Sequence, residues 1–119
     1  MANILAVDDM RSMRDLVKSV LEKRGHTVTT QDDGETALEF AQSNKVDLVI
    51  SDIVMPGMDG IQFMKEAKKS FPYLDFVIMT GYSADYSYVE IIEAGAADYM
   101  TKPFEMVELK ARIGRIERE

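Results

Sequence analysis

Three aspartates stand just after apolar stretches of this sequence, where they could do chemistry. Asp8 and Asp9 follow residues 4–7 (ILAV), and Asp52 comes soon after residues 48–50 (LVI). Three neighbouring carboxylates repel one another and resist ionising together, and a divalent cation removes that penalty. Oxygen-only ligands favour Mg²⁺, which is held by few carboxylates, keeps waters and often takes a phosphoryl oxygen. If the aspartates meet in space, they predict a magnesium site.

A hydroxyl and a lysine stand in the same relation to two further runs. Thr80 follows residues 76–79, and Lys102 follows residues 97–100 after one intervening threonine. Lys102 adds a positive charge that could pair with Asp52 or with a bound phosphoryl group, and Thr80 offers a hydrogen bond. The set is similar to a phosphoryl-transfer site without a nucleotide cradle, because the sequence has neither GxxxxGK[ST] nor GxGxxG.

Each of these residues also has an ordinary structural explanation when it is taken alone. Asp8 and Asp9 could cap the next helix, where acidic side chains favour the helix dipole. Asp52 could open a turn, since Asp favours such positions. Thr80 could be a loop hydroxyl and Lys102 a surface lysine. Because these explanations would have to hold after four separate runs at once, the joint pattern favours a shared site.

The elements that must position these residues alternate along the chain. Five strand-like runs cover residues 4–7, 27–30, 48–50, 76–79 and 97–100. Apolar residues at helical spacing occupy residues 13–21, 37–41, 61–71, 84–91 and 106–116. Strict alternation predicts parallel strands joined by right-handed crossovers, with helices on both faces of the sheet.

The composition of the runs predicts the strand order. The first, third and fourth runs are nearly all apolar, as strands covered on both faces must be, whereas the second and fifth are polar or short. The order 2-1-3-4-5 satisfies this, and it describes a flavodoxin-like, doubly wound α/β fold. Ligands of such a sheet bind beyond the carboxyl ends of the strands, which is where the three aspartates, the threonine and the lysine would converge.

Composition and charge narrow the functional classes. The chain has 119 residues, the size of one domain, and no cysteine, which excludes disulfides and Cys-based metal sites. The formal net charge of −7 gives no overall basic excess for binding nucleic acid. No secretory signal is recognisable, and no apolar run approaches the ~20 residues that span a membrane. We therefore expect one cytoplasmic domain over residues 1–119, without direct contact to nucleic acid or membrane.

Four motifs spread over the chain carry a resemblance to a known family. They are Val7-Asp8-Asp9, residues 51–60 (SDIVMPGMDG), Met79-Thr80-Gly81 and Lys102-Pro103-Phe104. Together they resemble the response-regulator receiver domain of two-component signalling, in a form similar to the chemotaxis regulators. The resemblance covers essentially the whole chain. It implies a domain that takes a phosphoryl group onto itself and switches conformation, not an enzyme with a separate substrate.

The resemblance implies a role for each matching residue at the reaction centre. Asp52 is similar to the aspartate that accepts the phosphoryl group, and Thr80 and Lys102 to the groups that contact its oxygens. Tyr99 matches the aromatic position that changes rotamer together with Thr80 on activation. The bond between Lys102 and Pro103 is expected to be cis, as is typical of the family.

The resemblance also implies a magnesium ligand set. Asp9 is similar to the direct ligand, Asp8 to the ligand that acts through water, and Asp52 to the ligand that also takes the phosphoryl group. Val54 occupies the position whose backbone carbonyl binds the metal. The side chains of Val54 and Tyr82 correspond to positions that influence water access, and they predict slow loss of phosphate.

The partners implied by the resemblance are of two kinds. A sensor histidine kinase or a histidine phosphotransfer protein would supply the phosphoryl group from phosphohistidine. An output domain or a downstream protein would read the switch through the face made by the fourth helix, the fifth strand and the fifth helix.

Two other families share part of this chemistry. A phosphohydrolase of the haloacid-dehalogenase type uses Asp, Thr, Lys and Mg²⁺, but its nucleophile follows the first strand in a DxD pattern and it usually carries a cap domain. A flavin-binding module would need a phosphate-cradling loop after the first strand, where Asp8 and Asp9 would repel a phosphate. Away from the site, Arg112, Arg115 and Arg118 are expected to form a solvated charged face.

Overall fold

A computed structural model describes residues 2–81 and 86–118 of the chain. Within them, strands and helices alternate without exception, as the sequence predicts. The strands are β1 (Asn3–Val7), β2 (Thr27–Gln31), β3 (Leu48–Asp52), β4 (Asp75–Thr80) and β5 (Asp98–Thr101). The helices are α1 (Arg11–Glu22), α2 (Gly34–Ser43), α3 (Gly60–Ser70), α4 (Tyr88–Glu93) and α5 (Met106–Arg118). In the part of the chain described, no helix is long and apolar enough to cross a membrane.

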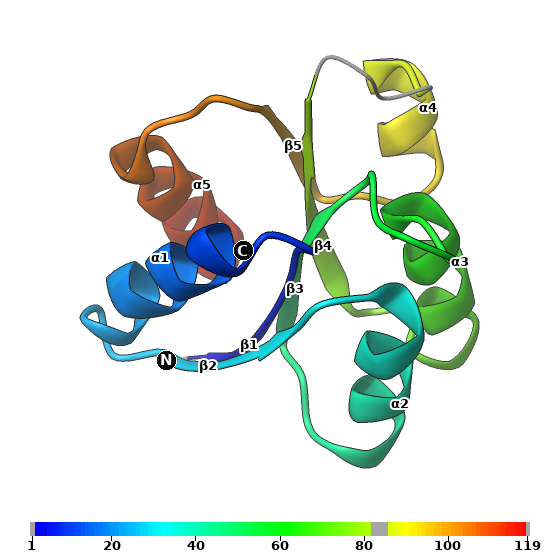
Figure 1. Cartoon of the computed structure of the whole chain (residues 1–119), viewed down its shortest axis with the longest axis horizontal. Helices are drawn as coiled ribbons and strands as arrows, with labels where there is room; N and C mark the ends of the chain where they lie inside the picture. Colours follow the sequence, from blue (N-terminus) through cyan, green and yellow to red (C-terminus); the bar gives the residue numbers. More distant parts are fainter. Residues whose placement is uncertain (1, 82–85, 119) are drawn as a thin grey trace.

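The strands form one parallel sheet with the order β2-β1-β3-β4-β5, which confirms the predicted flavodoxin-like fold. Figure 1 shows α1 and α5 on one face of the sheet and α2, α3 and α4 on the other. Strand β3 is buried along its whole length, whereas β2 at the edge is largely half-buried. The strand compositions therefore place the central strands correctly, because a strand that is covered on both faces is mostly apolar.

Each face of the sheet has its own hydrophobic core. Successive residues of a strand point to opposite faces, so Leu5 and Val7 pack against α2 and α3, while Ile4 and Ala6 pack against α1 and α5. The core below α2, α3 and α4 also contains the edge-to-face ring pair Phe63 and Phe76. These two layers fix the sheet, and through it the positions of the strand ends.

The fourth helical segment differs most from its prediction. The apolar spacing runs over residues 84–91, but the helix α4 begins at Tyr88 and has six residues. Ser87 caps it, since the Ser87 hydroxyl accepts from Glu90 N at 3.1 Å and Glu90 Oε1 accepts from Ser87 N at 2.9 Å. Ala84, the first apolar position of the predicted helix, lies outside the described residues.

Helix α3 begins directly against the backbone of the strand that carries Asp52. The Asp59 carboxylate caps the helix by accepting from Gln62 N at 2.8 Å, and Gly60 N donates to the Ile53 carbonyl at 2.8 Å. A Cβ atom on Gly60 would overlap the backbone carbonyl oxygen of Asp52. A glycine is thus required here for close approach of the two backbones.

Gly60→Ala is therefore expected to destabilise the fold by about 1–3 kcal/mol, because the added methyl group overlaps rigid backbone. Urea unfolding followed by circular dichroism measures this loss. Gly81→Ala is the matched control, since none of the described heavy atoms lies within 4 Å of the Cβ it would add. Equal stability of the Gly60 variant and the native chain would contradict the steric explanation.

Candidate functional site

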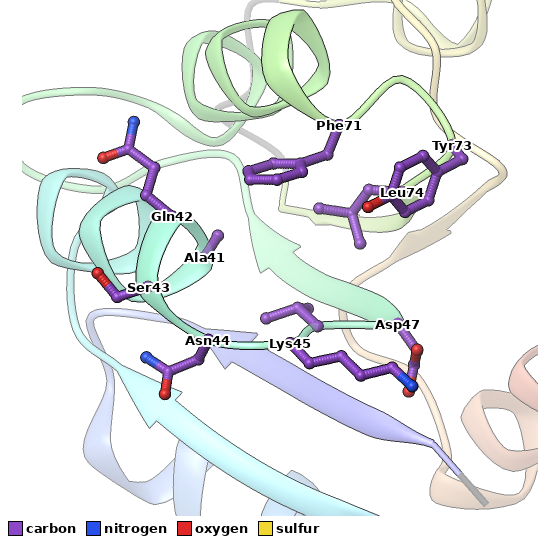
Figure 2. Close-up of a pocket in the computed structure, with 10 residues that line it drawn as sticks. Ala41, Gln42, Ser43, Asn44, Lys45, Asp47, Phe71, Tyr73 and Leu74 are labelled. Carbon is purple, nitrogen blue, oxygen red and sulfur yellow. The ribbon is translucent and has the colours of Figure 1, made fainter.

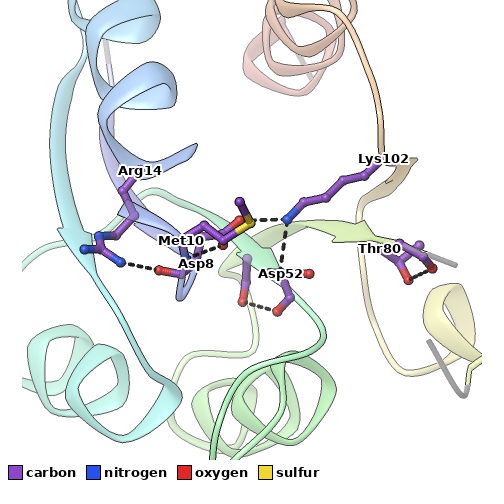
Figure 3. Close-up of polar contacts among 8 residues, drawn as sticks. Asp8, Met10, Arg14, Asp52, Thr80 and Lys102 are labelled. Carbon is purple, nitrogen blue, oxygen red and sulfur yellow. Dashed lines mark hydrogen bonds and ion pairs between the residues drawn. The ribbon is translucent and has the colours of Figure 1, made fainter. Parts of the chain in front are cut away.

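The residues that the sequence singles out meet at the carboxyl ends of the strands (Figure 3). Asp52 is the last residue of β3 and Thr80 the last of β4, while Asp8 follows β1 and Lys102 follows β5. Each of these strands ends in a loop at the same edge of the sheet, so residues far apart in sequence become neighbours. The structure thus places Asp8, Asp52, Thr80 and Lys102 at one edge of the sheet, and their shared role stays a prediction.

Lys102 joins the carboxylates across the site. Its Nζ lies 2.9 Å from Asp8 Oδ2 and 3.1 Å from Asp52 Oδ2, and both aspartates are buried. The Lys102 backbone N donates to the Thr80 carbonyl at 2.7 Å, and the bond from Lys102 to Pro103 is cis. Lys102 is thus anchored by its backbone next to β4 and by its side chain to β1 and β3.

The three carboxylates form an acidic pocket that could hold a metal ion. Asp8, Asp9 and Asp52 each offer an oxygen, and these oxygens all lie within 4.8 Å of one another. Asp9 is exposed, whereas the other two are buried. A set of hard oxygen ligands, open to solvent on one side, fits a cation such as Mg²⁺ or Ca²⁺ better than a soft transition metal.

Burial opposes ionisation of Asp52, and the nearby charges offset burial only in part. Burial raises the pKa of the Asp52 carboxyl; Lys102 lowers that pKa, Asp8 raises it again, and the net direction is upward. Burial lowers the pKa of Lys102, but its hydrogen bond to Asp8 and the charges of both aspartates outweigh burial and raise it. Lys102 therefore stays protonated at neutral pH and offsets only part of the repulsion between the carboxylates.

Asp8 does not act as a conventional helix cap. The cap position of α1 is Met10, which makes no capping bond through its side chain. The Asp8 carboxylate instead accepts from Met10 N at 2.9 Å through Oδ1, while Oδ2 accepts from Lys102. The explanation of Asp8 as an N-cap is wrong, because its carboxylate is directed into the site.

The expected switch residues lie beside the site. Thr80 is buried, and its hydroxyl donates to the Gly81 carbonyl at 3.2 Å. Tyr99 is half-buried on β5 and packs edge-to-face against Tyr88 of α4, with ring centroids 5.2 Å apart. The side chain of Val54 is exposed just after β3. Tyr82, the other residue expected to control water access, lies outside the described residues.

Two sets of contacts were missed by the sequence analysis. Arg14 of α1 donates to the Asp8 carbonyl at 2.8 Å. Arg112 and Arg115 of α5 both bind the carboxylate of Asp98, which is buried at the start of β5. The expectation of a solvated arginine face is therefore wrong for Arg112, which is half-buried, whereas Arg115 is exposed even though it pairs with Asp98. No local pattern signals such contacts, because their partners are distant in sequence or on the backbone.

A hollow of about 340 Å³ lies at the opposite edge of the sheet (Figure 2). Its walls are residues 41–47, which end α2 and lead to β3, together with Phe71, Tyr73 and Leu74 before β4. It faces the amino ends of β3 and β4, whereas Asp52 and Thr80 stand at their carboxyl ends. The hollow is therefore separate from the acidic pocket.

Comparison with known proteins agrees with this geometry. Residues 4–114 match the model of the response regulator receiver domain. The chain belongs to the receiver family. It is 38% identical over 113 residues to the alkaline phosphatase synthesis transcriptional regulatory protein PhoP of Bacillus subtilis, covering 95% of this chain and 47% of PhoP. The receiver thus spans about half the length of that regulator.

Solved receiver structures have the same fold. The receiver domain of the Francisella response regulator 1452 superposes with a TM-score of 0.91 at 28% identity, over 99% of this chain and 98% of that one. The Thermotoga maritima response regulator TrrA, solved with Mg²⁺-BeF, gives 0.87 at 36% identity, over 97% of this chain and 98% of that one. The match favours the receiver family over the phosphohydrolase and flavin-binding alternatives.

The raised pKa of Asp52 predicts a pH-dependent gain of stability in Asp52→Asn. Between the ordinary value of 3.8 and the raised pKa, the folded receiver binds more protons than the unfolded chain, so stability falls as pH rises through this window. The amide cannot ionise and escapes this loss. We expect a higher free energy of unfolding than in the native receiver at pH 7, and a difference that shrinks below pH 3.8.

Urea unfolding at pH 7 and again below pH 3.8 measures this difference in the free energy of unfolding. Glu39→Gln is the control for net charge, since Glu39 is an exposed carboxylate on α2. It should give no comparable gain at neutral pH. A lower stability of Asp52→Asn than of the native receiver at pH 7 would show that ionised Asp52 is favoured by its surroundings.

Proposed function

We propose that this receiver domain, over residues 1–119, accepts a phosphoryl group on Asp52. The observation that carries the proposal is the placement of Asp52. It closes the central strand β3, is buried apart from 6% of its surface, and is held at 3.1 Å by Lys102 beside two further carboxylates. A nucleophile on a strand end is fixed by the sheet, and the loop that follows turns the chain aside.

The reaction is a transfer onto the domain itself. An Asp52 carboxylate oxygen attacks the phosphorus of a phosphohistidine in line, the P–N bond breaks, and the imidazole of the donor leaves. The product is an acyl phosphate on Asp52. The donor is a sensor histidine kinase or a histidine phosphotransfer protein, and the only turnover is loss of phosphate from the same residue.

We propose Mg²⁺ as the cation of the acidic pocket, held by Asp8, Asp9, Asp52 and the backbone carbonyl of Val54. Two unit charges 4 Å apart interact by roughly 4 kcal/mol at an effective dielectric constant of about 20, so the carboxylates alone would repel an incoming phosphoryl group. Bound Mg²⁺ would neutralise them and polarise a phosphoryl oxygen. That TrrA was solved with Mg²⁺-BeF supports this choice.

Lys102 and Thr80 receive the transferred group in this proposal. The Lys102 ammonium already lies between Asp8 and Asp52, so it can move its hydrogen bond from a carboxylate to a phosphoryl oxygen without crossing the site. The Thr80 hydroxyl has only a backbone carbonyl as its bonded partner in the described structure, and rotation about one bond frees it for the phosphoryl group.

The same threonine starts the switch. If Thr80 turns toward Asp52, space opens near the inner side of β5, and Tyr99 can turn into it and leave Tyr88. The exposed apolar side chains of Tyr88, Val89 and Val107 lie on α4 and α5. We propose that this face of α4, β5 and α5 is read by an output domain or a downstream protein, by a shift between two packings.

Acetyl phosphate tests the acceptor directly. Intact mass spectrometry should show one added phosphoryl group when Mg²⁺ is present and none when a chelator removes it. Asp52→Asn should give no adduct, because an amide is neither an anion nor a competent nucleophile. Asp47→Asn, just before the other end of β3, is the matched control and should be labelled like the native receiver. An adduct on Asp52→Asn would refute the assignment.

Thr80→Ala tests the coupling between the site and the α4-β5-α5 face. We expect the variant to accept phosphate, because Asp52 and Lys102 remain, but to lose the NMR shifts that phosphorylation causes around Tyr99. Thr101→Ala, an exposed threonine at the end of β5, should keep both properties. Full shifts in the Thr80 variant would show that the hydroxyl does not transmit the signal.

A further inference from the structure

The connection between β1 and α1 carries two of the three carboxylates, and Asp8 is its most constrained residue. Its N donates to the Gln31 carbonyl at 3.3 Å, and its two carboxylate oxygens accept from Met10 N and from Lys102 Nζ, each at 2.9 Å. The remaining polar atom of Asp8 is its carbonyl oxygen, which accepts from Arg14 Nη1 at 2.8 Å. Every polar group of Asp8 is thus engaged, and Arg14 holds the carbonyl of the peptide bond to Asp9.

Arg14 lies in the first turn of α1, where the helix dipole disfavours a positive charge. The first turn of α1 has no acidic residue, and Arg11 and Arg14 lie near this positive end of the helix dipole. Arg14 is half-buried there, so its charge is not simply left in solvent. Residues that break a local preference are expected at functional sites, where another interaction offsets the cost. At Arg14 that interaction is the bond to the Asp8 carbonyl, beside the carboxylates (Figure 3).

We infer that Arg14 is a positioning residue for the acidic pocket, a role that rests on the proposed magnesium site. The Asp8 carbonyl and the Asp9 nitrogen share one rigid peptide plane, so the direction of the carbonyl determines the direction in which the chain enters Asp9. By holding that carbonyl, Arg14 keeps the exposed Asp9 carboxylate within reach of Asp8 and Asp52. Arg14 does so from α1 and would not itself be a metal ligand.

Positioning and simple electrostatics predict opposite results when Arg14 is removed. A positive charge near a cation site repels the cation, so its loss alone would tighten Mg²⁺ binding. Loss of the bond to Asp8 would instead release the Asp8–Asp9 peptide and weaken Mg²⁺ binding. Groups that orient metal ligands typically contribute about 10–100-fold to affinity. The sign of the change therefore separates the two effects.

Calorimetric titration of the unphosphorylated receiver with Mg²⁺ measures this sign. We expect Arg14→Met to bind Mg²⁺ about 10-fold more weakly than the native receiver. Arg11→Met is the matched control: it removes the same charge from the same turn, but Arg11 is exposed and pairs only with the exposed Asp15 at 3.7 Å among the described residues. Its Mg²⁺ affinity should be unchanged or slightly higher.

Two further measurements make the result specific to positioning. Arg14→Lys keeps the charge but ends one bond short of the guanidinium nitrogen, so it should also bind Mg²⁺ more weakly than the native receiver. In transfer from acetyl phosphate, Arg14→Met should need more Mg²⁺ for half-maximal rate, yet approach the native rate at saturation. A folding defect would instead lower the rate at all Mg²⁺ concentrations.

Native or tighter Mg²⁺ affinity in Arg14→Met would overturn the inference and leave the proposed acceptor intact. So would a transfer rate that stays low at saturating Mg²⁺, since that would place the defect in folding or in the reaction. Failure of the native receiver to bind Mg²⁺ would overturn the proposed metal site together with the role of Arg14. The two failures are therefore distinguishable in the same titration.

Discussion

The structure depends on one ammonium group that is shared between two buried carboxylates. Lys102 Nζ joins Asp8 after β1 to Asp52 at the end of β3, while its own backbone bonds to Thr80 at the end of β4. The ends of these three strands thus meet at Lys102. Removing Lys102 would leave two buried carboxylates without a positive charge, which costs more than an exposed pair contributes. The arrangement is therefore possible only on a sheet whose strand ends are held rigidly together.

That rigidity comes from the two cores and from close approach at Gly60. The cores on the two faces fix β1, β3 and β4, and α3 begins against the Asp52 backbone, where a Cβ would not fit. The Asp59 carboxylate that caps α3 also accepts from the Tyr86 hydroxyl at 2.9 Å. The segment between β3 and α3 is thereby tied to Tyr86, just before α4, so a movement of one would displace the other.

The fold and the shared placement of the site could be predicted from the sequence because both follow from local order. Apolar runs alternate with helical spacing, and parallel strands bring whatever follows each run to one edge. The start of α4 was not predicted, since the bond of Ser87 to Glu90 overrides apolar spacing there. The contacts of Arg14 and Arg112 were missed for another reason. They are side-chain contacts to a carbonyl or to a distant carboxylate, and such pairs leave no periodic signal.

The raised pKa of Asp52 links the stability of the receiver to its chemistry. Burial and the charge of Asp8 disfavour the ionised carboxylate, yet only that form can attack phosphorus. A carboxylate whose charge was fully neutralised by neighbouring cations would be more stable. It would, however, bind a further cation weakly and would be a poor acceptor for a phosphoryl group. The receiver keeps instead a site that is only partly neutralised by Lys102. Functional sites often lower the stability of a protein. Here the negative charge that Lys102 leaves unneutralised also attracts a cation.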